Sequence, residues 1–190
     1  MARGSPCRNS ALGSSGSTLP GEAGRDGLRA SPGMCVALES VDQPEVIALI
    51  DELDAYQKPL YPAESHHGID IAALLEPDVL FVVARDEGGQ AIGCGAVVLE
   101  RGYGELKRMY TRPGHRGRGV GRAVLAMLES EARARGCTRF LLETGYLQSE
   151  AIALYERSGY RRRGPFGAYV EDPNSVFMQK VESGFDDDRE

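Results

Sequence analysis

A short stretch rich in glycine and arginine, from Arg112 to Arg122, has the composition of a phosphate-binding loop. It reads Arg-Pro-Gly-His-Arg-Gly-Arg-Gly-Val-Gly-Arg and precedes a segment with helical periodicity. Glycine lets the backbone turn tightly and approach a ligand, and the free amides and positive dipole end of a helix start favour an anion. The stretch equally fits a solvated basic turn that caps a helix, so its neighbours in the sequence must decide.

Two common phosphate loops do not fit this stretch. A P-loop ends in Gly-Lys-Ser or Gly-Lys-Thr, and the dinucleotide-binding loop needs Gly-x-Gly-x-x-Gly or Gly-x-Gly-x-x-Ala; neither pattern occurs here. Glu143 stands about where a dinucleotide fold places its ribose-binding acid, but the strand before the loop follows a predicted hairpin. The dinucleotide-binding interpretation therefore ranks low.

The overall composition is that of a globular protein that must capture any anion locally. Of the 190 residues, 42% are hydrophobic and 26% are charged, and the formal net charge of -6 gives no global basic field for nucleic acid. Every apolar run is far shorter than the roughly 20 residues of a membrane helix. The four cysteines show no CxxC or Cys/His pairing suited to a metal. We expect a cytoplasmic protein without a metal, a nucleic-acid partner or a membrane partner.

The chain divides into three parts. Residues 1–33 are dominated by Gly, Ser, Pro and Arg and predict a flexible low-complexity extension, although Met34 is an alternative true start. This segment also weakly resembles an organelle transit peptide. Residues 34–181 carry the foldable sequence and form one predicted domain, and residues 182–190 form an acidic tail.

Hydrophobic periodicity predicts that strands and helices alternate within the domain. The predicted helices are Pro44–Tyr56, Ile69–Leu75, Gly119–Arg135 and Gln148–Ser158; the predicted strands are Val36–Glu39, Val79–Arg85, Ala91–Glu100, Glu105–Thr111, Phe140–Glu143, Tyr160–Arg163 and Ser175–Gln179. The prolines of Lys58–Pro62 predict extended chain, and Asp86–Gln90 predicts a hairpin turn. This order indicates an α/β fold, a mixed sheet flanked by helices.

Three motifs in the same order resemble the GNAT N-acetyltransferases. Arg116-x-x-Gly119-x-Gly121 is similar to the family's Arg/Gln-x-x-Gly-x-Gly/Ala pattern, which binds the pyrophosphate of coenzyme A. The preceding Glu105–Tyr110 resembles its central strand, and Ala151–Tyr160 resembles its AxxLYxxxGF segment. The resemblance covers most of residues 34–181, extends to small bacterial members of mostly unassigned acceptor, and implies the GNAT fold, with a mostly antiparallel sheet splayed at the acetyl-CoA site.

The resemblance implies acetyl-CoA as co-substrate. It places the pyrophosphate on the glycine and arginine loop and the thioester along the preceding strand, where the Met109 N–H is the expected oxyanion donor. The implied binding residues are Met109, Tyr110, Thr111, Arg116, Gly117, Arg118, Gly119, Val120, Gly121, Arg122 and Gln148. Gln148 stands where many members carry Asn, which offers the same amide chemistry.

The resemblance also implies two catalytic side chains. Tyr155 matches the tyrosine whose hydroxyl lies near the coenzyme A sulfur and can protonate the thiolate. Glu105 stands where many relatives place a carboxylate that draws the proton from the amine. The structural alternatives are a core tyrosine on an amphipathic helix and a strand-edge glutamate.

The acceptor site is implied by the first helices, their connecting loop and the last strands. Its candidate residues are Tyr61, Glu64, His66, His67, Phe166, Tyr169 and Ser175. We expect transfer to a primary amine of a small molecule or amino acid by direct attack, and a homodimer is compatible with this interpretation. A protein lysine or N-terminal acetyltransferase and a non-catalytic acetyl-CoA sensor remain as alternatives.

Overall fold

The computed structural model describes residues 33–65 and 67–181. The predictions for residues 1–32, for His66 and for the tail of residues 182–190 lie outside this part. In chain order its elements are β1 (Cys35–Leu38), α1 (Pro44–Gln57), η1 (Ala63–Ser65), η2 (Ala73–Leu75), β2 (Val79–Arg85), β3 (Ala91–Glu100), β4 (Tyr103–Thr111), η3 (Pro113–His115), α2 (Val120–Arg133), β5 (Arg139–Gly145), α3 (Ser149–Arg157), β6 (Arg161–Arg163) and β7 (Ser175–Val181).

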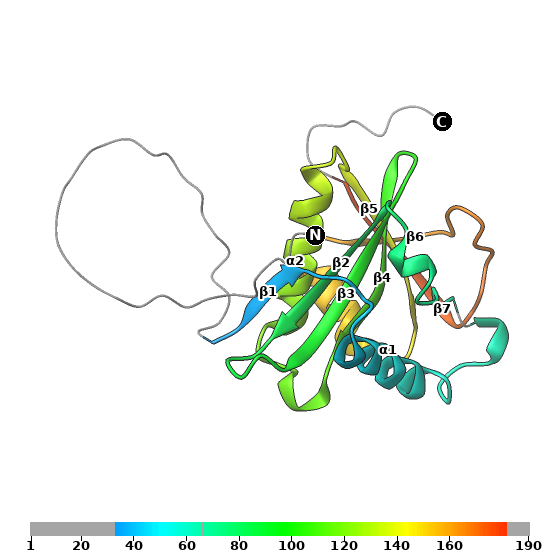
Figure 1. The fold of residues 1–190 in the computed structure, drawn as a ribbon. Helices are drawn as coiled ribbons and strands as arrows, with labels where there is room; N and C mark the ends of the chain where they lie inside the picture. Colours follow the sequence, from blue (N-terminus) through cyan, green and yellow to red (C-terminus); the bar gives the residue numbers. More distant parts are fainter. Residues whose placement is uncertain (1–32, 66, 182–190) are drawn as a thin grey trace.

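The strands form one seven-stranded sheet in the order β1-β2-β3-β4-β5-β7-β6 (Figure 1). Neighbouring strands pair antiparallel except β4 and β5, which run parallel in the middle of the sheet. A parallel pair needs a crossover connection, and α2 supplies it. The predicted fold class, a mixed and mostly antiparallel sheet with flanking helices, is confirmed.

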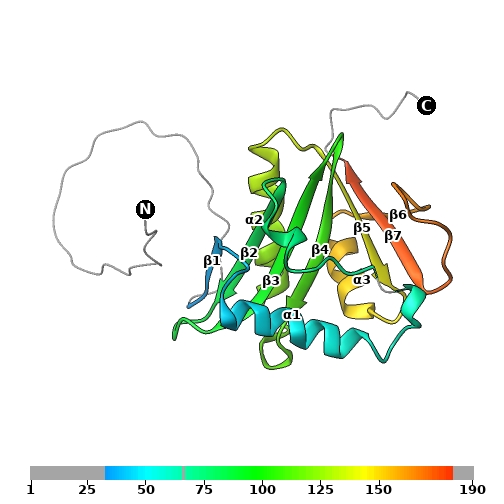
Figure 2. The same cartoon turned by 45° about the vertical axis from the view of Figure 1, so that its right-hand side comes forward.

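The helices cover opposite faces of the sheet (Figure 2). On β2, Leu80 and Val82 belong to the core under α2 and α3, whereas Phe81 and Val83 pack in the core under α1. Because successive strand residues point to opposite faces, an almost continuously apolar strand is what two covered faces require. The central strands are therefore covered by helices on both faces.

The sheet opens at β4 and β5. Their pairing joins Gly104–Leu106 to Phe140–Leu142 and goes no further, although β4 continues to Thr111 and β5 to Gly145. On the other side of β4 the register with β3 shifts between Cys94 and Ala96. The extra residue of this bulge lies on β4, where Arg108 and Met109 face Gly95, and Arg108 has a φ of 54°, the one positive φ among described residues other than glycine. A bulge bends its strand and re-aims side chains, so it assists the separation that the splayed-sheet prediction requires.

Two local predictions are wrong. Ile69–Leu75 was expected to be a helix but contains only the 3-10 turn η2, since Asp70 accepts bonds through both its carbonyl and its side chain and turns the chain there. Lys58–Pro62 turns instead of extending: Lys58 keeps helical angles as the C-cap of α1, and Leu60 donates to the Gln57 carbonyl. The prolines end the helix without straightening the chain. Among the described residues, no helix is both long and apolar enough to cross a bilayer.

Candidate active site

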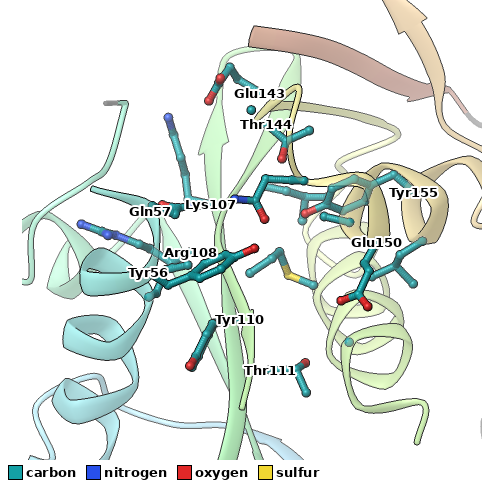
Figure 3. Close-up of a pocket in the computed structure, with 18 of the residues that line it drawn as sticks. Tyr56, Gln57, Lys107, Arg108, Tyr110, Thr111, Glu143, Thr144, Glu150 and Tyr155 are labelled. Carbon is teal, nitrogen blue, oxygen red and sulfur yellow. The ribbon is translucent and has the colours of Figure 1, made fainter. Parts of the chain in front are cut away.

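The separated strands border a cavity of about 1680 Å³. Side chains of α1, β4, α2, β5 and α3 line it together with the glycine and arginine loop (Figure 3). Typical small-molecule pockets have volumes of roughly 300–1,000 Å³. The cavity therefore has room for two substrates together.

The loop brings an uncapped helix start into this cavity. Gly119 is the N-cap of α2, has a φ of 83° and offers no side chain to the helix, so the first-turn N–H groups lack a side-chain acceptor. Gly119, Val120 and Gly121 all line the cavity. A Cβ on Gly121 would lie 3.2 Å from Leu154 Cδ2, which shows how closely the helix start approaches α3. These free N–H groups and the helix dipole suit a phosphate group.

Replacing Gly119 by alanine is expected to weaken both the fold and anion binding. A side chain in the left-handed conformation costs about 1–2 kcal/mol, and the amides that follow would shift with it. We expect a lower melting temperature and a raised Kd for coenzyme A by calorimetry. Gly114→Ala is the matched control, because Gly114 is not among the described residues with positive φ and has open space around its Cα. Equal behaviour of the two variants would contradict the role of Gly119.

Tyr155 reaches the cavity from α3. Its residue is only 5% exposed, yet it lines the cavity, and its hydroxyl has no hydrogen-bond partner among the described residues. Burial raises the pKa of Tyr155, with a smaller contribution from the charge of Glu143. The phenol therefore stays protonated at neutral pH and is available as a donor.

Glu143 reaches the same cavity from β5, where pairing with β4 has ended. The Ser175 hydroxyl donates to it over 2.6 Å. Burial raises the pKa of the Glu143 carboxyl above its ordinary value, against the lowering effects of Ser175, His67 and Lys107. A half-buried carboxyl with a raised pKa and a tyrosine that line one cavity are typical candidates for proton transfer.

Glu105 lies beside this cavity instead of lining it. Its carboxylate accepts a hydrogen bond of 2.6 Å from Tyr169 and an ion pair of 2.8 Å from Lys107. Lys107 also donates to the Tyr169 hydroxyl and the His67 carbonyl. Phe166 and Tyr169 pack with Phe177, so these two predicted acceptor residues form an aromatic support outside the cavity lining.

Two loops meet over the carboxyl end of β5. The Asn174 amide donates to Ser65 Oγ over 3.2 Å, and His67 Nε2 lies 4.0 Å from Asp172.

Tyr61 reaches the same end of β5, where its hydroxyl accepts a hydrogen bond from the Leu147 N–H over 3.2 Å. The Tyr61 ring lies directly against Gly145, where a Cβ would be 2.1 Å from Tyr61 Cζ, so a side chain at this position would displace the Tyr61 ring. The loop that follows α1 is thereby tied across the opening between the strands.

The structure brings most of the predicted site residues together. Those that line the cavity are Met109, Tyr110, Thr111, Arg116, Gly117, Gly119, Val120, Gly121, Arg122, Gln148, Tyr155, Tyr61 and His67. Arg118 faces a separate small hollow beside Asp86 and Glu87, Glu64 lies in η1, and Ser175 holds Glu143. Within residues 33–65 and 67–181, no group of three histidine, cysteine or acidic side chains is placed to hold a metal ion.

Several cavity residues were missed by sequence reasoning, and those that matter most here are Tyr56, Lys107 and Glu143. Glu143 was weighed only as a ribose-binding acid of another fold. Its acidic side chain in an apolar strand, Phe140–Gly145, was the available signal, because a carboxylate in a covered strand needs a specific reason. Tyr56 and Lys107 carried no such signal.

Comparison with known proteins agrees with this geometry. The chain is 50% identical over 151 residues to "IAA acetyltransferase" from Azospirillum brasilense, covering 78% of this chain and 98% of that protein. It resembles the crystal structure of an acyl-CoA N-acyltransferase from Klebsiella pneumoniae with a TM-score of 0.70 and 43% identity, covering 78% and 97% of the two chains. The PaiA N-acetyltransferase from Thermoplasma acidophilum, solved with coenzyme A, shares the fold at a TM-score of 0.61 and 16% identity, over 78% and 99% of the chains.

Fold and site together define an acyltransferase that uses a coenzyme A thioester. The Acetyltransferase (GNAT) family matches residues 46–160, which is more than half of the chain. The chain therefore belongs to the GNAT family and is an acetyl-CoA-dependent acetyltransferase.

Proposed function

We propose that this protein transfers the acetyl group of acetyl-CoA to a primary amine of a small molecule, by direct attack of the amine. The observation that carries the proposal is that Glu143 on β5 and Tyr155 on α3 line one cavity beside the unpaired length of β4. A proton acceptor and a proton donor in one cavity meet the two needs of amine acetylation. No residue has to form a covalent acyl-enzyme.

The chain's own residues suit the co-substrate. The uncapped start of α2 and the side chains of Arg116 and Arg122 would hold the pyrophosphate, and Gln148 would contact the same molecule from the start of α3. Met109 on β4 would donate its N–H to the thioester oxygen. Acetyl-CoA supplies the activated acetyl group when bound.

The proposed proton path uses Glu143 and Tyr155, which line the same cavity. Glu143 takes a proton from the amine as nitrogen bonds to the acetyl carbon, directly or through water. Tyr155 gives its phenol proton to the sulfur as the carbon–sulfur bond breaks. Glu105 was expected to be the base, but it lies outside the cavity lining and its carboxylate is bound by Tyr169 and Lys107. Its proposed role is to hold the side chains of Tyr169 and Lys107 in place beside the cavity.

A small acceptor is favoured over a protein. Ser65 bonds to Asn174 and His67 lies near Asp172. Tyr61 bonds to the turn after β5, so the acceptor end is bordered by linked loops. A peptide chain would need an open groove across this region. The relative from Azospirillum brasilense is named for IAA, a small molecule, which supports a small acceptor over a protein.

An amine screen tests the proposal. The full-length protein with acetyl-CoA is offered free amines, amino acids and lysine peptides; thiol release is followed, and the acetylated product is identified by mass. We expect turnover with free amines or amino acids. Reaction with peptides alone would favour the protein acetyltransferase, and binding of acetyl-CoA without turnover on any amine would favour the sensor.

A further inference from the structure

Tyr56 in the last turn of α1 extends beyond the sheet that the rest of the helix covers. The buried face of α1 consists of Val46, Leu49, Ile50 and Leu53. Tyr56 follows Leu53 by three residues and thus lies close to the same side of the helix. Strands β4 and β5 have separated at this end, so the Tyr56 ring lies at the cavity instead of over a paired sheet.

The Tyr56 side chain is available to a ligand. It is 39% exposed, lines the cavity and points across it towards the side from which Tyr155 enters (Figure 3). The Tyr56 ring belongs to none of the described hydrophobic clusters. Its apolar surface is therefore available to contact a ligand in the cavity.

Tyr56 also contacts the phosphate-binding loop. The Arg116 guanidinium carbon lies 5.4 Å from the centre of its ring, a cation–π distance. The same guanidinium donates to the Thr111 carbonyl over 3.3 Å and lies 3.5 Å from Glu150. Tyr56 therefore stands between the loop, which suits the pyrophosphate, and Tyr155, which suits the sulfur.

The part of coenzyme A that joins pyrophosphate to sulfur is the pantetheine arm, a largely apolar chain with two amide groups. We infer that the Tyr56 ring forms the α1 wall of the channel for this arm; the inference rests on the proposed function of the loop and of Tyr155. Tyr56 is a binding residue for the co-substrate, and its ring, not its hydroxyl, makes the contact. A plain surface cation–π pair with Arg116 would instead affect only stability.

Two probes separate these roles in the full-length protein: coenzyme A, and 3′-phosphoadenosine 5′-diphosphate, which keeps the pyrophosphate but lacks the pantetheine arm. For Tyr56→Ala we expect the Kd of coenzyme A to rise about five-fold or more, while the Kd of 3′-phosphoadenosine 5′-diphosphate stays within about two-fold. Tyr56→Phe keeps the ring and should bind both probes like the wild type. Tyr146→Ala is the matched control, since Tyr146 is 52% exposed but lies outside the cavity lining.

The outcomes are distinguishable by calorimetry without any acceptor. An unchanged Kd of coenzyme A in Tyr56→Ala overturns the inference. Equal losses for both probes overturn it too, because Tyr56 would then act only by holding Arg116. Wild-type protein that binds neither probe overturns the proposed function as well. Melting temperatures of the variants confirm that each is folded.

Discussion

Tyr155→Phe is expected to lower kcat by about a hundred-fold or more while the Kd of coenzyme A stays unchanged. The variant keeps the buried ring in place on α3 and removes only the hydroxyl, which has no hydrogen-bond partner among the described residues. Stability should hardly change, since no bond within the protein is lost. Without a proton donor at the sulfur, the thiolate must leave unprotonated. Thiol release at saturating acetyl-CoA, with calorimetry for binding, measures both quantities.

Tyr160→Phe is the matched control. The Tyr160 ring lies 5.7 Å from that of Tyr155, but its hydroxyl donates to buried Glu129 over 2.9 Å. Losing a hydrogen bond to a charged group costs about 1.5–3 kcal/mol, so this variant should melt earlier and keep its kcat. If Tyr155→Phe kept more than about half of the wild-type kcat, Tyr155 would not be the acid.

The sequence predicted the fold well where the pattern is local. Val79–Arg85 and Ala91–Glu100 match β2 and β3 residue for residue, since their apolar runs and the turn between them leave one interpretation. The prediction of a helix over Ile69–Leu75 was wrong because the helical pattern of so short a segment is weak, and the Asp70 side chain turns the chain there. The splay of β4 from β5 is a tertiary feature, and it came only from the family resemblance.

The site was predictable only in part, for a physical reason. The phosphate loop is contiguous, so its residues could be found together in the sequence. The choice between Glu105 and Glu143 depends on what surrounds each carboxylate: Tyr169 lies 64 residues from Glu105 along the chain, and Ser175 lies 32 residues from Glu143. Partners at such separations follow from the sheet order, in which β7 is inserted between β5 and β6.

The two carboxylates provide the second large effect. Glu143→Gln is expected to lower kcat/KM for the amine by about a hundred-fold or more, because it removes the proton acceptor from the cavity. The amide still accepts a hydrogen bond from Ser175, so the fold should be preserved. Glu105→Gln makes the same chemical change outside the cavity lining and should reduce kcat/KM far less. Initial rates with the best amine of the screen compare the two.

The pH profile distinguishes a base from a supporting residue. Burial raises the pKa of Glu143, and a base must be ionised, so kcat/KM should fall as pH drops through a value above the ordinary carboxyl pKa of about 4.3. Glu143→Gln should lose this acid limb, whereas Glu105→Gln should retain it. Loss of the limb in Glu105→Gln instead would return the base role to Glu105. In that case the Tyr169–Glu105 bond would have to open during the reaction, since the carboxylate is otherwise occupied.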